Sequence, residues 1–290
     1  MRYSISDLEK LSGVKAHTIR IWEKRYALLR PMRTGGNIRY YDEQQLKKLL
    51  HTASLIASGM KISAVSKLNP EEMRAAVDKV HDSQADARAE IHVHRLIEAC
   101  ADMDERLFEH VFNNALLGSD LVTVFTGVVN PLLNRVGYLW SVNDMLPAEE
   151  HFVTSIVRRK LFAAIDSIPL PESSRESWVL FLPDDEEHEV NLLLSAFLLR
   201  QSGRKVVYLG SQVPMDNLSQ VIDKVNPTHL QFFWVRKHAP EKVQGFIDAL
   251  HAKYPKLNKV MSINPLFDNT LSVPSAYQIT RSIEEFLEIL

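Results

Sequence analysis

The sequence predicts a multidomain chain: a basic head of short helices with a hairpin, a helical middle, and an α/β domain with a parallel sheet. Three observations predict it. Charge is divided, because residues 1–70 carry a net charge of +8 and the remainder −10, although the 290-residue chain sums to only −2. Residues 87–168 show helical periodicity broken by short turns. After residue 174, short apolar runs alternate with helical segments.

The composition bounds the class of protein. At 46% hydrophobic and 24% charged residues, the chain is neither disordered nor fibrous. Its single cysteine, Cys100, allows no internal disulfide and is too few for a cysteine-based zinc site, so we expect a reducing, cytoplasmic compartment. The most apolar run, residues 192–199, is well short of the roughly 18 residues of a membrane span, and Asp7 interrupts any signal-peptide core.

The first 26 residues predict two short helices around a turn. The spacing from Ser6 to Glu9 is that of a capping box and predicts a helix over residues 6–11, which Gly13 ends. A second helix over residues 15–26 has an apolar face of Ile19, Trp22 and Tyr26 and a basic face of His17, Arg20 and Lys24. This plan is typical of a helix-turn-helix, whose second helix lies in the major groove.

The segment after the second helix predicts a wing. Gly35 and Gly36 favour a tight hairpin between two basic arms, and Asp42 then caps a helix that stops at Gly59. Charge, turn and hairpin together favour double-stranded DNA as the partner over a solvated basic surface with no DNA role. We expect the DNA contacts to come from Lys15, His17, Thr18, Arg20, Lys24, Arg25, Arg33, Arg39 and Tyr40.

These residues resemble the winged helix-turn-helix head of the MerR family of transcriptional regulators. The resemblance covers about the first 68 residues and is carried by runs such as Thr18-Ile19-Arg20-Ile21-Trp22-Glu23, Leu29-Arg30-Pro31 and Arg39-Tyr40-Tyr41. Lys15 departs from it, since a Ser N-cap is frequent there. We expect a homo-oligomer, a dimer or tetramer, on an inverted-repeat site. No sustained heptad follows residues 69–70, so we expect the oligomer contacts to come from another part of the chain than a coiled coil after the head.

Two further domains are predicted after the head at residues 1–70. Residues 84–168 indicate a helical bundle, and a Pro- and Ser-rich linker precedes an α/β domain over residues 174–290. Ligands of such sheets collect at the carboxyl ends of the strands, where the loop after the first strand places Glu186 and His188.

Two features of these domains suggest a ligand. His188 stands at the mouth of the expected crevice, although a histidine near a helix start also serves as a surface or capping residue. In the bundle, Trp140 is followed ten residues later by Glu150 and His151, although a bundle Trp is often simply core. The residues alone leave both interpretations open.

The arrangement resembles the cobalamin-binding module of photoreceptor-type MerR regulators, a bundle with Trp-x9-Glu-His followed by a Rossmann-like (flavodoxin-like) domain. The resemblance implies that His188 ligates the cobalt of adenosylcobalamin, with Glu186 hydrogen-bonded to the other ring nitrogen. It implies that Trp140 caps the adenosyl group and that Glu150 and His151 border it. In that family, light cleaves the cobalt–carbon bond and disassembles the DNA complex.

The sequence departs from this module where the cofactor's nucleotide tail enters. Asn191 replaces the motif Gly, Phe233 replaces a Ser, and Ile263 and Asn264 replace a Gly pair. Each change adds bulk, and adding methylenes to a packed core costs about 1–3 kcal/mol. Four alternatives therefore remain open for this module: cobalamin with its tail inserted, cobalamin with its tail outside, a different ligand, and a module that serves only oligomerisation.

We expect a sequence-specific DNA-binding regulator whose C-terminal module drives oligomerisation and senses adenosylcobalamin and light. One alternative is a cofactor-independent regulator controlled by a protein partner or another ligand. A second alternative is a cobalamin-dependent enzyme component. We expect no enzyme, because the sequence contains no Gly-x-Ser-x-Gly, phosphate loop or His-Glu-x-x-His motif.

Overall fold

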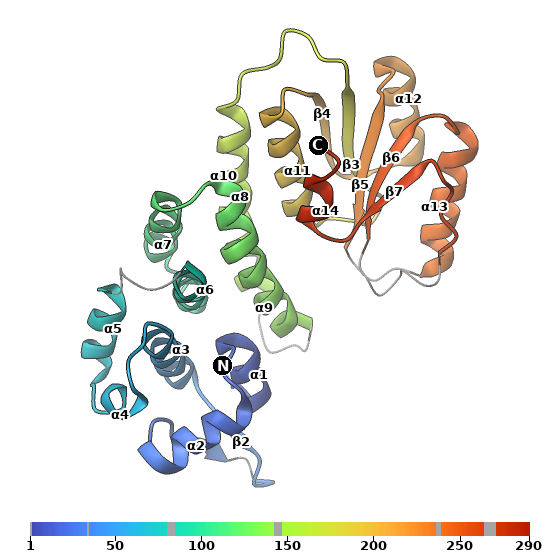
Figure 1. The fold of residues 1–290 in the computed structure, drawn as a ribbon. Helices are drawn as coiled ribbons and strands as arrows, with labels where there is room; N and C mark the ends of the chain where they lie inside the picture. The colour runs from blue at the N-terminus through green and yellow to red at the C-terminus, as the bar shows by residue number, and fades with distance from the viewer. Residues whose placement is uncertain (1, 34, 80–84, 142–146, 236–238, 264–270) are drawn as a thin grey trace. The chain divides into compact units, whose positions relative to one another are not determined.

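The computed structural model divides the chain into two compact units, residues 1–155 and 156–290. The structure describes residues 2–33, 35–79, 85–141, 147–235, 239–263 and 271–290 (Figure 1). Within these ranges, no helix combines the length and the apolar character that a membrane span requires.

Unit 1 begins with two helices around a tight turn. Ser4 caps the first through a capping box with Asp7, two residues before the expected start at Ser6: its hydroxyl accepts the Asp7 amide, and the Asp7 carboxylate accepts the Ser4 amide at 2.6 Å. The expected box partner, Glu9, instead accepts the Ala16 amide at 3.0 Å and so caps the second helix. The elements of the head are α1 (Ile5–Ser12), α2 (Ala16–Tyr26), β1 (Met32–Arg33), β2 (Arg39–Tyr40), α3 (Glu43–Ala57), α4 (Ile62–Val65) and α5 (Pro70–Asp78).

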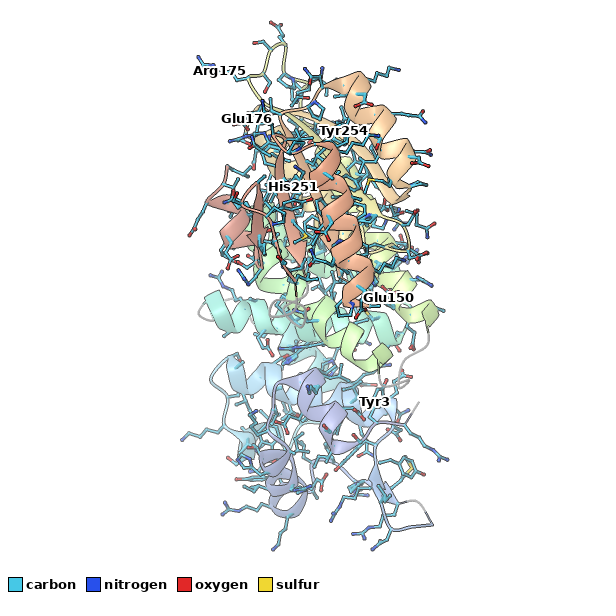
Figure 2. All side chains as sticks on the ribbon, turned by 90° about the vertical axis from the view of Figure 1, so that its right-hand side faces the viewer. Tyr3, Glu150, Arg175, Glu176, His251 and Tyr254 are labelled. Atoms are coloured by element: carbon cyan, nitrogen blue, oxygen red, sulfur yellow. The ribbon has the colours of Figure 1, made fainter. Side chains whose placement is uncertain are left out.

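The hairpin of the wing is present as predicted. β1 and β2 pair antiparallel, with Arg33 opposite Arg39. Tyr3, labelled in Figure 2, exchanges two backbone hydrogen bonds of 2.8 Å with Tyr41 and so ties the N-terminal segment to the end of the wing. Asp42 caps α3 by accepting the Gln45 amide, as its spacing predicts.

The rest of unit 1 is a helical bundle. Asp104 and Asp120 cap two of its helices by accepting the amides of Leu107 and Thr123. A π-helical turn joins α8 to α9 and places one extra residue in an otherwise continuous helix. The elements are α6 (Ala85–Ala101), α7 (Glu105–Leu117), α8 (Leu121–Val124), η1 (Phe125–Val129), α9 (Asn130–Ser141) and α10 (Pro147–Asp166), in which the unit boundary falls.

Unit 2 is built on a five-stranded parallel sheet with the order β4-β3-β5-β6-β7. This is the flavodoxin-like order, in which the chain first extends the sheet to one side of β3 and then to the other. The sequence did not predict β7 or α14. The elements are β3 (Ser177–Pro183), α11 (Val190–Gln201), β4 (Lys205–Val213), α12 (Met215–Val225), β5 (His229–Trp234), α13 (Pro240–Lys253), β6 (Asn258–Ile263), β7 (Tyr277–Thr280) and α14 (Ile283–Leu287).

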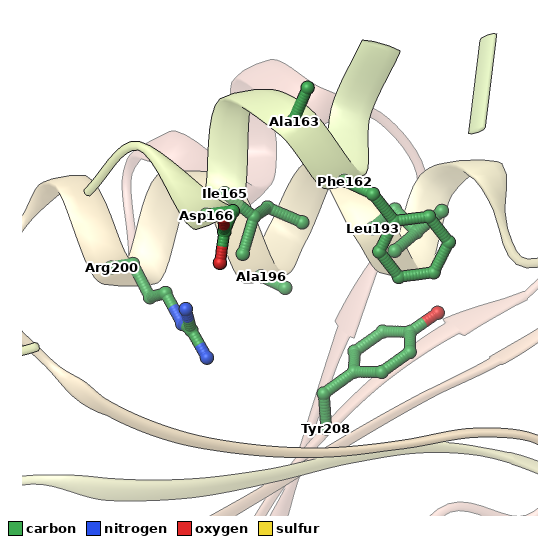
Figure 3. Close-up of a pocket in the computed structure, with 8 residues that line it drawn as sticks. All are labelled: Phe162, Ala163, Ile165, Asp166, Leu193, Ala196, Arg200 and Tyr208. Carbon is green, nitrogen blue, oxygen red and sulfur yellow. The ribbon is translucent and has the colours of Figure 1, made fainter. Parts of the chain in front are cut away.

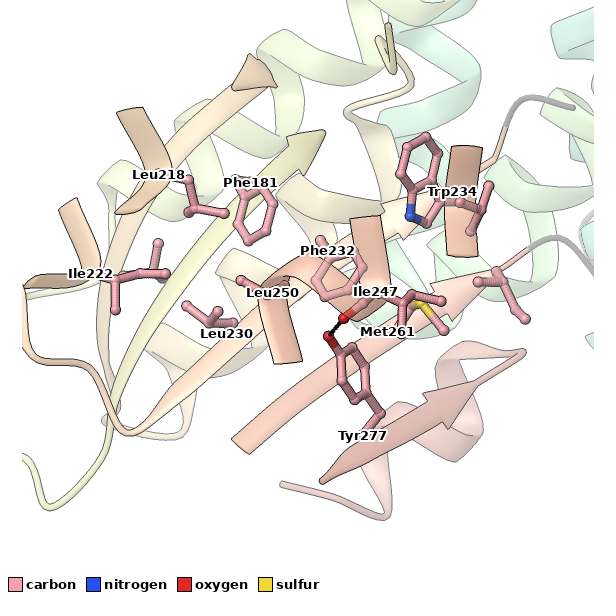
Figure 4. Close-up of a cluster of buried hydrophobic side chains, with 13 residues drawn as sticks. Phe181, Leu218, Ile222, Leu230, Phe232, Trp234, Ile247, Leu250, Met261 and Tyr277 are labelled. Carbon is pink, nitrogen blue, oxygen red and sulfur yellow. Dashed lines mark hydrogen bonds between the residues drawn. The ribbon is translucent and has the colours of Figure 1, made fainter. Parts of the chain in front are cut away.

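The two faces of the sheet are covered differently. On one face, α12 and α13 bury an aromatic-rich core around Phe232, in which the Tyr277 hydroxyl donates to the Ile247 carbonyl at 2.9 Å (Figure 4). On the other face, Gln231 of β5 donates to Ser195 of α11 at 2.9 Å, and both residues are fully buried. The predicted fold class is confirmed: a winged helix-turn-helix head, a helical bundle and a Rossmann-like parallel-sheet domain.

Candidate DNA-binding surface and ligand site

The basic side chains predicted to contact DNA are on the surface of the head. Ile19 and Trp22 are buried, which turns the charged face of α2 outward. Glu23, the one acid among residues 15–39, accepts a hydrogen bond from the Tyr41 hydroxyl, so its carboxylate is held by the head itself. The predicted set consists of exposed Lys15, His17, Arg20, Lys24, Arg25, Arg33 and Arg39 and half-buried Thr18 and Tyr40.

Two residues that sequence reasoning missed complete this surface. Lys15 makes no side-chain cap at the start of α2, and Glu9 supplies the missing acceptor for the Ala16 amide. The hydrogen bonds that Glu9 accepts from the Ala16 amide and from Lys15 Nζ lower the pKa of its carboxyl. Arg2 adds a cation beside the wing, with its guanidinium 4.8 Å from the ring centroid of Tyr40.

The second candidate site lies where the chain leaves β3. Glu186 is fully buried there, and its Oε1 accepts the amides of Glu187 and His188 at 3.0 and 3.2 Å. Its Oε2 accepts the Val235 amide at 2.9 Å. Because Val235 directly follows β5, this carboxylate joins β3 to β5 at the point where the strand order reverses, which is where ligands of such folds bind.

Glu186 also orients His188. Its Oε1 lies 2.5 Å from His188 Nδ1, the pairing that the family resemblance implies, and 42% of the His188 side chain is exposed. With Nδ1 held by the carboxylate, Nε2 is the nitrogen that could ligate a metal. The described residues contain no group of three or more His, Cys, Asp or Glu placed for a bare metal ion.

The bundle residues predicted to border a ligand belong to unit 1. Glu150, labelled in Figure 2, and His151 are consecutive in α10, with Glu150 Oε2 3.3 Å from His151 Nδ1. The His151 side chain is 75% exposed. Trp140 belongs to α9, and its side chain lies outside the part of the chain that the structure describes. Among the predicted ligand residues, the structure therefore pairs Glu150 with His151 in unit 1 and Glu186 with His188 in unit 2.

The sheet interior is filled where a nucleotide tail would need space. Phe233 is only 6% exposed, and the hydrogen bond between Gln231 and Ser195 ties the same face of β5 directly to α11. Ile263 is 5% exposed, and Asn264 lies outside the described residues. His188, held by Glu186, would suit the cobalt of a corrinoid, whereas the filled face of β5 does not fit an inserted tail.

A cavity of about 500 Å³ lies elsewhere in unit 2 (Figure 3). Phe162 and Tyr208 face each other across it, with ring centroids 6.2 Å apart. Its walls are Phe162, Ala163, Ile165, Asp166, Leu193, Ala196, Arg200 and Tyr208. None of these is a candidate ligand residue, so this cavity does not replace the missing tail site.

Comparison with known proteins matches two segments of the chain to family models. Residues 3–72 match a family model described as MerR HTH family regulatory protein, and residues 93–164 match one described as B12 binding domain. The HTH-type transcriptional repressor CarH of Myxococcus xanthus is 30% identical over 258 residues, which are 88% of this chain and 86% of CarH. The chain belongs to the MerR family of transcriptional regulators.

Further similarities agree with this family. The HTH-type transcriptional repressor CarA of Myxococcus xanthus is 27% identical over 260 residues, 88% of this chain and 84% of CarA. The monomethylamine corrinoid protein of Methanosarcina barkeri has a TM-score of 0.54 at 12% identity, covering 67% of this chain and 96% of its own, which shows a common fold. This MerR-family protein is therefore a DNA-binding transcriptional regulator with a cobalamin-binding type of module, as the sequence predicts.

Proposed function

We propose that this regulator binds an inverted-repeat operator as a homo-oligomer and that its C-terminal module holds a corrinoid through His188. The observation that carries the ligand part is the buried Glu186 carboxylate, which fixes one ring nitrogen of an exposed histidine at the switch point of the sheet. The relatives' description as repressors supports repression as the outcome on DNA. Adenosylcobalamin would supply the light-sensitive cobalt–carbon bond.

The filled interior defines the form of corrinoid that we propose. Phe233 and the hydrogen bond from Gln231 to Ser195 fill the face of β5 that packs on α11, so the nucleotide tail of a bound cobalamin would lie outside the sheet. A corrinoid without the tail, such as cobinamide, would then have the same contacts with His188. We therefore propose that cobalamin and cobinamide bind with similar affinity.

Visible absorbance after desalting tests both statements. The full chain is incubated in the dark with adenosylcobalamin or adenosylcobinamide, together with His188→Ala and, as a control, His110→Ala, an exposed histidine on α7. We expect both corrinoids to be retained by the unaltered chain and by His110→Ala, and neither by His188→Ala. Retention of cobalamin alone would contradict the tail-out mode. A colourless protein that still binds DNA would instead support the cofactor-independent regulator.

The DNA part is tested by selecting bound sequences from a random duplex library with the full chain. We expect an inverted repeat, and a fall in affinity as salt increases, because lysine and arginine contacts to phosphates release counterions. Arg20→Ala should weaken binding to the selected site by about 5- to 150-fold, the usual range for an arginine that contacts a base. Arg106→Ala, an exposed arginine on α7, is the control and should leave affinity unchanged.

A further inference from the structure

The turn between α1 and α2 is held by side chains of the bundle. Arg135 of α9 donates through Nη1 to the Leu11 carbonyl at 3.0 Å, and His94 of α6 donates through Nε2 to the Ser12 carbonyl at 3.0 Å. These carbonyls end α1, where a helix cannot satisfy its own acceptors. The bundle therefore caps the first helix of the DNA-reading motif.

A single carboxylate organises both donors. Glu90 accepts from Arg135 Nη2 through both oxygens, at 2.8 and 2.9 Å, and its Oε1 lies 3.1 Å from His94 Nε2. Burial alone would raise the pKa of Glu90, but hydrogen bonds and charges from His94 and Arg135 outweigh it and lower the pKa to about 2. We call Glu90, His94 and Arg135 the turn clamp.

The clamp reaches two elements of the head. The His94 side chain is 2% exposed, and its Nδ1 lies 2.9 Å from the Ser54 hydroxyl of α3. Gly13 approaches the clamp so closely that a Cβ on it would lie 3.1 Å from Glu90 Oε1, and its φ of +71° is one that L side chains rarely adopt. The shape of the turn is thus matched to the carboxylate beneath it.

We propose that Arg135 and His94 are positioning residues for DNA recognition. α2 begins at Ala16, only four residues after Ser12, so the clamp that fixes the end of α1 also fixes the angle of α2 to the bundle. Both residues lie within the segment that matches the B12 binding domain. A rearrangement of α6 or α9 would therefore move the recognition helix directly. This coupling between the bundle and the recognition helix rests on the proposed DNA binding and needs no particular corrinoid.

A double-mutant cycle on DNA affinity tests the proposal with the full chain without added corrinoid. The chains compared are unaltered, Arg20→Ala, Arg135→Ala and the double variant, on the selected operator and at a temperature where all are folded. We expect Arg135→Ala to weaken operator binding by about tenfold. We also expect the loss of affinity caused by Arg20→Ala to be smaller by about fivefold or more in the Arg135→Ala background, because a displaced α2 no longer places Arg20 against the DNA. Simple loss of stability would not change the effect of Arg20→Ala.

Matched variants keep the test decisive. Arg135→Lys retains the charge but cannot donate to both oxygens of Glu90 from a planar guanidinium. Its operator affinity should therefore lie between those of the unaltered chain and Arg135→Ala. If Arg135→Ala does not fold, Arg135→Lys and His94→Gln replace it in the same cycle. Independent, multiplicative effects of the two positions, or an Arg135 variant that binds like Arg106→Ala, would overturn the proposal. Loss of all operator binding by the unaltered chain would instead reject the proposed function.

Discussion

Two histidines of this chain, His94 in unit 1 and His188 in unit 2, are each oriented by a carboxylate, yet they differ in burial. His94 is 2% exposed, and both of its ring nitrogens hydrogen-bond to residues of the head. His188 is 42% exposed, and Glu186 holds its Nδ1. A carboxylate beside a histidine therefore does not by itself indicate a ligand site. What separates the two histidines is how far the side chain is buried.

The largest expected effect is on stability at the buried histidine. His94→Ala leaves the Ser12 carbonyl and the Ser54 hydroxyl without their partner and opens a cavity, so we expect a loss of about 3 kcal/mol in the free energy of unfolding. His188→Ala should cost less, about 1 kcal/mol, because its side chain is 42% exposed and leaves no closed cavity. Urea unfolding of the two variants measures the difference. Equal losses would show that burial does not separate the two histidines.

The next effect concerns the carboxylate that orients His188. Glu186→Gln replaces one acceptor oxygen with a donor among backbone amides, so we expect corrinoid affinity to fall by about 10- to 100-fold, the usual cost of losing such an orienting partner. Titration followed by visible absorbance measures it. Glu187→Gln, at the exposed neighbouring position, should bind as the unaltered chain does. Unchanged affinity in Glu186→Gln would mean that the orientation of His188 does not matter for binding.

A smaller effect is expected at the turn that the clamp holds. Gly13→Ala forces a side chain into a left-handed conformation and against Glu90, so the free energy of unfolding should fall by about 1–2 kcal/mol. Gly118 ends α7 with a φ of −112° and has no atom within 4 Å of an added Cβ, so Gly118→Ala should be neutral or slightly stabilising. Thermal unfolding of both variants checks this, and equal shifts would contradict a close fit at Gly13.

The smallest effect is a dependence on pH. The pKa of Glu90 is about 2 in the folded chain and 4.5 ordinarily, so its contribution to stability is present above pH 4.5 and is lost as the pH falls toward 2. Glu90→Gln should therefore lose less stability than the unaltered chain between pH 4.5 and 3, as measured by urea unfolding at both values. Parallel loss in the two proteins would show that Glu90 is not stabilised as a carboxylate.

Local patterns in the sequence predicted most of this structure. The wing, the Asp42 cap and the early strands of the sheet all follow from residues close together in the chain. The capping box was misplaced to Ser6 because Ser4 and Ser6 are each followed three residues later by an acid. The sequence alone could not choose between them, since what decides is that Glu9 is engaged by α2.

The features that were missed depend on contacts between distant segments. Arg135 and Leu11 are 124 residues apart, and nothing in the sequence near either one indicates that they meet. β7 spans only four residues, Tyr277–Thr280, and it pairs with β6 in the folded sheet without a strong alternating pattern of its own. Burial of Phe233 could be anticipated from its bulk, whereas the buried hydrogen bond between Gln231 and Ser195 could not.

The π-helical turn Phe125–Val129 has a consequence for the rotational phase of α9. One extra residue in a helix rotates everything that follows by about 100° about the helix axis relative to an uninterrupted α-helix. Arg135 follows this turn on the same helical path and reaches the Leu11 carbonyl. Deleting one residue between 125 and 129 would swing its guanidinium to another side of the helix while leaving the composition of the bundle almost unchanged. The single extra residue thus sets the side of α9 from which Arg135 reaches the turn between α1 and α2.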